Sequence, residues 1–183
     1  MATTPAANTF LQRLIGAAAL DPAIYEEVEA DRTATGQAFS VVIASSLAAG
    51  LGARAWGGAT FTNVAFFGTV SLIAWGAWAI VTFEIGTRIL PEAQTRADVG
   101  QLLRTIGFAS APGILRVFGI LPAVTIPVFA ITAVWMLAAM VVAVRQALDY
   151  QSTGRAIGVC LFGWVLAVAF AIAIGIFFGP TVS

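Results

Sequence analysis

Long apolar stretches separated by short polar segments are the main pattern along this chain. Each of five stretches is apolar over about 20 residues, the length that an α-helix needs to cross a hydrocarbon layer about 30 Å thick. They cover roughly residues 35–53, 65–87, 101–120, 123–144 and 156–178. The pattern therefore predicts an all-α, polytopic membrane protein with five transmembrane helices.

The third and fourth stretches follow each other with almost no polar residue between them. The 40 residues between Arg104 and Arg145 contain a single charge. This length is too great for one crossing of the membrane. Gly119 and Pro122 are residue types that favour a turn, so we expect two helices that meet near these positions.

The residues before the first apolar stretch have a different pattern. In "FLQRLIGAA" the large apolar side chains share one helical face, which predicts a short amphipathic helix in the inner membrane interface. The following "DPAIYEEVEADR" begins with an N-cap residue and a proline and then carries acids, which predicts a cytoplasmic helix. Its acidic face is either simply solvated or a docking surface for a basic partner, with Glu26, Glu27 and Glu29 as candidates. We therefore separate residues 1–33 from a transmembrane domain of residues 34–183.

Composition agrees with a membrane protein and narrows its chemistry. Charged residues make up 10% of the chain, whereas soluble domains contain about a quarter. All nine cationic residues are arginine, and this bias, together with abundant alanine and glycine, indicates a bacterial source. The chain contains no histidine, the commonest general base and metal ligand, and Cys160 is its single cysteine. We expect no enzymatic activity, cofactor, metal site or nucleic-acid partner.

The distribution of arginine predicts the orientation, because short cytoplasmic loops are enriched in positive residues. With the N-terminus inside, seven arginines lie on the cytoplasmic side and two on the outer side. The seven are Arg13, Arg32, Arg88, Arg96, Arg104, Arg145 and Arg155, and the two are Arg54 and Arg116. We expect a cytoplasmic N-terminus and an external C-terminus in the inner membrane.

Three charged residues within the apolar stretches are candidates for binding an anion or a lipid head group. Glu84 precedes Arg88 by four residues, a favourable helical spacing that predicts an interfacial ion pair, with an ion-coupling carboxylate as the alternative. Arg104 belongs to the inner end of the third stretch, where its side chain leans toward the cytoplasm and within reach of Glu84. The third candidate is Arg116.

Arg116 lies deeper in the third stretch, and its helical lean directs it back into the membrane. Pro112 and Gly113 precede it and predict a break in the helix, because proline removes a backbone hydrogen bond. The guanidinium then either satisfies carbonyls freed near Phe108 and Ala109, or holds an anionic lipid head group or another anionic ligand. Both readings remain open.

Small residues recur at every fourth position of the fifth stretch. Such a ridge lets helix backbones approach closely in lipid, where packing supplies the association. It predicts close packing with another helix, either within this chain or in a second copy. The ridge comprises Gly163, Ala167, Ala171, Gly175 and Gly179.

Three segments together are similar to landmarks of a known family. "FLQRLIGAAALDPAIYEEVEAD", "GFASAPGILRVFGILP" and "VWMLAAMVVAVRQALDY" resemble bacterial members of the Yip1 membrane-protein family. The resemblance spans most of the chain and implies five membrane helices with a cytosolic N-terminus. Eukaryotic members of that family act in vesicle trafficking and contact small Rab-type GTPases.

The leading functional hypothesis is a membrane-organising scaffold that binds partners and has no catalytic activity. Its partners would be membrane lipids and either further copies of the chain or another membrane protein. One alternative is a transporter or channel for an anion or lipid through the kinked third stretch. A second alternative is an accessory subunit of a larger membrane complex.

Overall fold

The computed structural model describes residues 8–53 and 61–178, and for residues 61–68, 70–71 and 167–178 it describes the backbone helix alone. These residues form helices joined by short turns, without a strand, which confirms the all-α prediction. The elements are α1 (Phe10–Ala18), α2 (Pro22–Ala30), α3 (Ala34–Gly52), α4 (Phe61–Glu84), the π-helical turn η2 (Ile85–Ile89), α5 (Val99–Phe108), the 3-10 helix η3 (Ala111–Ile120), α6 (Thr125–Ala147) and α7 (Thr153–Phe178).

Three segments within the described residues are long and apolar enough to cross a membrane: Ala34–Gly52, Leu72–Ile89 and Thr125–Ala147. This is fewer than the five predicted from sequence. Many of their large apolar side chains face outward, including Ile126, which is 70% exposed. Exposure of this kind along whole helices is consistent with a helical membrane protein, whose surface faces lipid.

The third predicted span is two elements instead of one continuous helix. Asp98 caps the start of α5, and η3 begins three residues after α5 ends at Phe108. Pro112 has no N–H, so the α-helical hydrogen bond to the Phe108 carbonyl cannot form. The N–H of Gly113 instead donates to the carbonyl of Ser110 at 2.9 Å, in the tighter 3-10 pattern.

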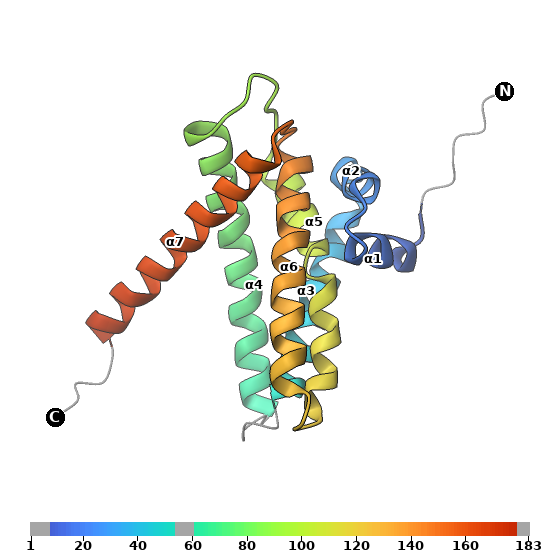
Figure 1. The fold of residues 1–183 in the computed structure, drawn as a ribbon, viewed down its shortest axis with the longest axis vertical. Coiled ribbons are helices and arrows are strands. Elements are labelled where there is room, and N and C mark those ends of the chain that lie inside the picture. The colour runs from blue at the N-terminus through green and yellow to red at the C-terminus, as the bar shows by residue number, and fades with distance from the viewer. Residues whose placement is uncertain (1–7, 54–60, 179–183) are drawn as a thin grey trace.

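The broken segment lies directly against α3 over much of its length (Figure 1). A Cβ atom at Gly52 would lie 1.9 Å from the carbonyl oxygen of Arg116, and one at Gly113 would lie 2.1 Å from Ser45 Oγ. The two backbones therefore touch at Gly52, and at Gly113 the backbone of η3 lies directly against the Ser45 side chain. Close backbone contact is what holds helices together in lipid, where burial of apolar groups supplies little drive.

The N-terminal helices share a hydrophobic core with the bundle. Tyr25 and Val28 of α2 are fully buried in a cluster with Phe108 and Ala139. The Tyr25 hydroxyl donates to the carbonyl of Ala17 at 3.0 Å, which ties α2 to α1. The segment that the sequence set apart as residues 1–33 is thus packed, over its described part, as a layer on the bundle.

Helix α1 exposes several large apolar side chains and buries its one charged residue. Leu11 and Ile15 are each 61% exposed, whereas Arg13 is 3% exposed. In Figure 1, α1 lies across the bundle rather than along it. Such an outer face is typical of a helix at a membrane interface, and that location stays a prediction from the sequence.

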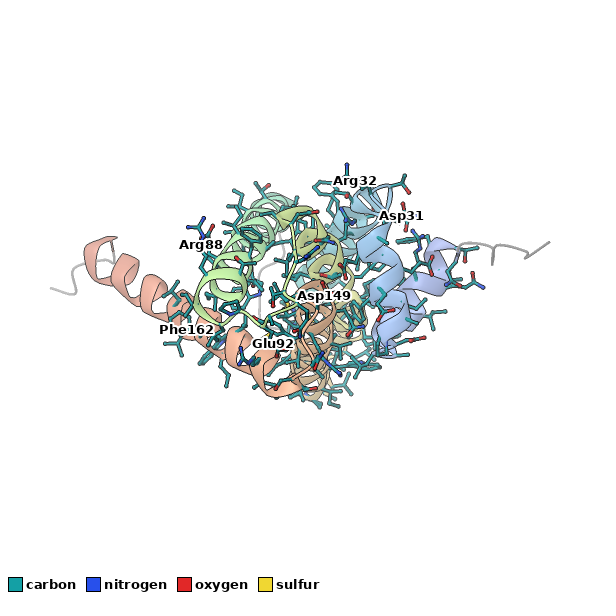
Figure 2. All side chains as sticks on the ribbon, turned by 90° about the horizontal axis from the view of Figure 1, so that it is seen from above. Asp31, Arg32, Arg88, Glu92, Asp149 and Phe162 are labelled. Atoms are coloured by element: carbon teal, nitrogen blue, oxygen red, sulfur yellow. The ribbon has the colours of Figure 1, made fainter. Side chains whose placement is uncertain are left out.

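The charged residues gather at one end of the bundle. The segment between η2 and α5 and the turn between α6 and α7 both lie at this end (Figure 1). Figure 2 looks onto it and shows Asp31, Arg32, Arg88, Glu92 and Asp149. The opposite end contains the turn from η3 into α6 (Figure 1).

Helix α7 is attached to the bundle through its first part and then runs obliquely away from it (Figure 1). Ala156, Val159 and Cys160 are buried in a cluster with Leu148 and Tyr150 at the end of α6. The next described residues on α7 are mostly exposed. They include Leu161 at 53%, Trp164 at 61% and Val165 at 60%.

We expect Gly52→Ala to lower the stability of the fold. Its Cβ would overlap the Arg116 carbonyl oxygen, so α3 and η3 must move apart, at a cost of about 1–3 kcal/mol. Gly76→Ala in α4 is the matched control, because a Cβ there meets nothing within 4 Å and alanine favours a helix. Thermal unfolding in detergent, followed by circular dichroism, measures both variants. Equal stability of the two would contradict the close contact.

Candidate functional site

The three charged residues proposed for a ligand do not come together in the structure. Arg104 is 5% exposed and donates from Nε to the carbonyls of Val28 and Glu29, at 3.0 and 3.1 Å, and from Nη2 to the Glu29 carbonyl. These carbonyls lie in the last turn of α2, where the helix dipole favours a cation. Arg104 therefore holds α2 against α5 instead of approaching Glu84.

Glu84 forms a local ion pair at the end of α4. Its Oε2 lies 2.9 Å from Nε of Arg88, and the two side chains are 43% and 73% exposed. This is the geometry expected from the four-residue spacing. An exposed pair of this kind contributes little to stability and leaves no carboxylate inside the bundle at this position.

Arg116 is the one of the three that lines a cavity. Its Nε donates to Thr132 Oγ1 at 3.2 Å, and its guanidinium carbon lies 5.5 Å from the centre of the Phe129 ring. One prediction from the sequence was that the guanidinium would bond to the carbonyls freed near Phe108. Among the described residues, its hydrogen bond goes instead to Thr132 on α6. Within the break, the carbonyl of Ser110 accepts from the N–H of Gly113.

The cavity beside Arg116 has a volume of about 560 Å³ and is lined by residues of α3, α4, α5, η3 and α6 and by Ser110 at the break. Its polar lining residues are Ser45, Ser46, Trp78, Ser110 and Arg116. Ser46 donates to the carbonyl of Val42 within its own helix at 2.8 Å. The indole N–H of Trp78 is buried and has no acceptor among the described residues. Cavities of this size hold small ligands in many proteins.

The acids at and after helix α2 are engaged within the protein. Nη2 of Arg13 lies 2.9 Å from Glu27 Oε1 and 2.8 Å from Asp31 Oδ2, and Nη1 donates to Gln37 at 3.0 Å. Burial raises the pKa of Glu27, but hydrogen bonds from Asn8 and Arg13 outweigh it, so that pKa lies below its ordinary value. This network clamps α1, α2 and α3 together.

The other two proposed acids of α2 face the end of α6. Gln146 donates to Glu26 at 2.8 Å, and Gln101 donates to Glu29 at 2.9 Å. Burial, with Asp149 as the next contribution, raises the pKa of Glu29 to about 7. A second cavity of about 450 Å³ lies here, lined by Glu26, Glu29, Arg145, Gln146, Asp149, Tyr150 and Gln151. The acidic face is therefore largely turned toward the protein.

The small-residue ridge of α7 is described in part. Gly163 is close to Trp78, because a Cβ at Gly163 would lie 3.0 Å from that ring. Ala167, Ala171 and Gly175 belong to the part of α7 for which the structure describes only the backbone, and Gly179 lies outside the described residues. The described end of the ridge thus packs within the chain.

Sequence reasoning did not single out Arg13, Ser45, Ser110 and Trp78 as members of these sites. For Arg13 a signal existed, because Glu27 and Asp31 are spaced four apart on one face of a helix and such a pair needs a cation. For the two serines and Trp78 no local pattern marks the cavity, since its walls come from separate helices.

Among residues 8–53 and 61–178, no group of three His, Cys, Asp or Glu side chains is placed to hold a metal ion. Scans of this chain against protein-family models, curated proteins and solved structures found no match. The resemblance to the Yip1 family therefore remains a proposal.

Replacing Arg13 tests the network that clamps the N-terminal helices. We expect Arg13→Gln to lower the free energy of unfolding by about 1.5–3 kcal/mol, because it leaves Glu27 and Asp31 facing each other without a cation. Arg32→Gln is the control, because Arg32 is exposed and its loss should change stability by less than about 0.5 kcal/mol. Unfolding in detergent and proteolysis of α1 and α2 measure the difference. An Arg13→Gln protein as stable as the control would refute the clamp.

The docking of α2 should weaken as the pH rises. The pKa of Glu29 is about 7 in the folded protein and 4.5 ordinarily, so its contribution to stability is complete below about pH 4.5 and is lost as the pH rises through 7. Glu26, Asp98 and Asp149 oppose its ionisation, while Arg104 favours it.

Hydrogen exchange of the α2 amides at pH 5 and pH 8 measures this effect, after correction for the intrinsic rate. We expect less protection at pH 8 in the native protein. Glu29→Gln cannot ionise, so its protection should be the same at both values. An identical loss of protection in the variant would place the effect on another group.

Proposed function

We propose that this chain is a bacterial, Yip1-like protein of the inner membrane that crosses the bilayer five times. In this proposal α5 and η3 together form the third crossing and α7 forms the fifth. Support comes from α5 and η3, which follow each other along α3 (Figure 1), and from the 26-residue length of α7. The N-terminus then lies in the cytoplasm, on the arginine-rich side, and the C-terminus lies outside.

The proposed function is that of a membrane-organising scaffold without enzymatic activity, which binds a second copy or another membrane protein through α7. The observation that carries it is the oblique departure of α7 from the bundle (Figure 1), with Val159 and Cys160 buried and the residues from Trp164 to Leu166 exposed. A helix that is only half packed against its own chain offers its remaining surface for close packing with another helix. Trp164 and Val165 lie on that surface, at 61% and 60% exposure.

The acids of α2 have a smaller part in this proposal than their sequence suggested. Glu27 is bonded to Arg13, and Glu26 and Glu29 accept hydrogen bonds from glutamines of the bundle. A basic partner would have to compete with these internal bonds. Partner binding in the membrane, through α7, is therefore the version that the geometry favours.

Site-directed crosslinking in native membranes tests the scaffold. In a Cys160→Ser background, which contains no other cysteine, Trp164→Cys and Val165→Cys introduce single thiols on the exposed side of α7. We expect these to form a crosslinked species, of twice the mass for a homo-oligomer or of another mass for a different partner. Ile131→Cys, on the 61%-exposed face of α6, is the control and should remain uncrosslinked.

Two results would count against the scaffold. One is that neither α7 cysteine variant forms a crosslinked species and that the protein is also monomeric in mild detergent. The other is equal crosslinking at α6 and α7, which would indicate random collision in the membrane instead of a specific contact.

A further inference from the structure

The cavity beside Arg116 has features that scaffolding through α7 does not require. It extends along the bundle, since Phe129 and Met140 both line it and are eleven residues apart on α6, about 16 Å of helix. One wall is apolar and includes Met136 and Met140, while α3 and the break supply hydroxyls and a charge. A cavity with this division matches an elongated ligand that is polar on one side and apolar on the other.

In the proposed five-span arrangement, the charge of Arg116 lies inside the bilayer, and no carboxylate among residues 8–53 and 61–178 forms an ion pair with it. Thr132, its hydrogen-bond partner, is seven residues into α6, about 10 Å from the start of that helix. Among the described residues, the arginines that form ion pairs are Arg13, Arg88 and Arg155. A guanidinium has five N–H donors, and a cation at this depth is costly unless an anion joins it.

Three other polar groups of the cavity also lack acceptors among the described residues, whereas Ser46 and Trp75 donate to backbone carbonyls. The hydroxyls of Ser45 and Ser110 make no hydrogen bond to the described residues, and Ser45 is 5% exposed. The Trp78 N–H is likewise unpaired, whereas the Trp75 and Trp135 N–H groups reach backbone carbonyls at 3.1 and 2.7 Å. The unpaired groups can all donate, so a ligand that fits them is rich in acceptor oxygens.

The helix break is what assembles this donor set. Pro112 ends the α-helical pattern and places Ser110 at the cavity wall, and the absence of a side chain at Gly113 lets Ser45 approach. Arg116 follows in the same 3-10 helix. In an unbroken α-helix, each residue is rotated by about 100° from the one before it, so Ser110 and Arg116 would point in different directions. The break instead groups them at one wall of the cavity.

We propose that this cavity binds one molecule of an acidic glycerophospholipid. Its phosphate binds the guanidinium of Arg116, its ester carbonyls accept from Ser45 and Ser110, and one acyl chain lies along Met136 and Met140. Phosphate and ester oxygens supply the acceptors that the cavity lacks, and the negative charge compensates the buried cation. A free anion would not contact the apolar wall of the cavity, so we do not propose it as the complete ligand.

Native mass spectrometry of the full chain, stripped of lipid in mild detergent, tests the proposal. The probes are phosphatidylglycerol, phosphatidylcholine with the same acyl chains, oleate and inorganic phosphate. We expect one phosphatidylglycerol per chain, bound at least tenfold more tightly than phosphatidylcholine, and no displacement by phosphate or oleate. Equal binding of the two phospholipids, or displacement of phosphatidylglycerol by oleate or phosphate, would overturn it.

Variants locate the site. Arg116→Gln should weaken phosphatidylglycerol binding at least tenfold, and Arg88→Gln, which changes an exposed arginine outside the cavity, should leave it within twofold. Ser45→Ala combined with Ser110→Ala removes only two hydroxyls and should weaken binding severalfold, so it decides the question if Arg116→Gln does not fold. Unchanged binding in either cavity variant, with the fold retained by circular dichroism, would refute the assignment.

Discussion

The contact between α3 and the broken α5–η3 segment is the constraint on which the rest of this structure depends. At Gly52 backbone lies against backbone, and at Gly113 the backbone of η3 lies against the Ser45 side chain, so an added side chain at either glycine would collide with the partner. In lipid such closeness replaces the hydrophobic drive that assembles soluble bundles. The break that permits it also directs Ser110 and Arg116 to the wall of the cavity. Packing and candidate chemistry therefore come from the same few residues.

The N-terminal helices also have an arrangement that suits a lipid environment better than water. Helix α1 turns Arg13 inward to Glu27 and Asp31 and turns Leu11 and Ile15 outward. In water this arrangement would expose apolar groups and desolvate charges, both of which cost free energy. At a membrane interface, exposing the apolar face of α1 costs little free energy, because that face contacts lipid. The ion pairs with Glu27 and Asp31 compensate the buried charge of Arg13.

Features that depend on residues close together in the chain were readable from the sequence. Proline chemistry at Pro112 ends a helix whatever surrounds it, and the structure has the end there. Glu84 and Arg88 meet because one turn of helix brings them together. The partners of Arg104 were misassigned for the opposite reason, since the carbonyls of Val28 and Glu29 lie far away in the chain and carry no distinctive side-chain signal.

By itself, the sequence determined that the chain is helical and built for a membrane, where its helices start and where one of them breaks. Apolar length and local backbone chemistry are enough for this, because each helix satisfies its own backbone in lipid. Only the tertiary structure decided that the acids of α2 bond to other parts of the chain, that α7 leaves the bundle, and that donors from α3, α4 and η3 line one cavity. These depend on which helices lie side by side, and helices alike in composition do not encode their neighbours in any local pattern.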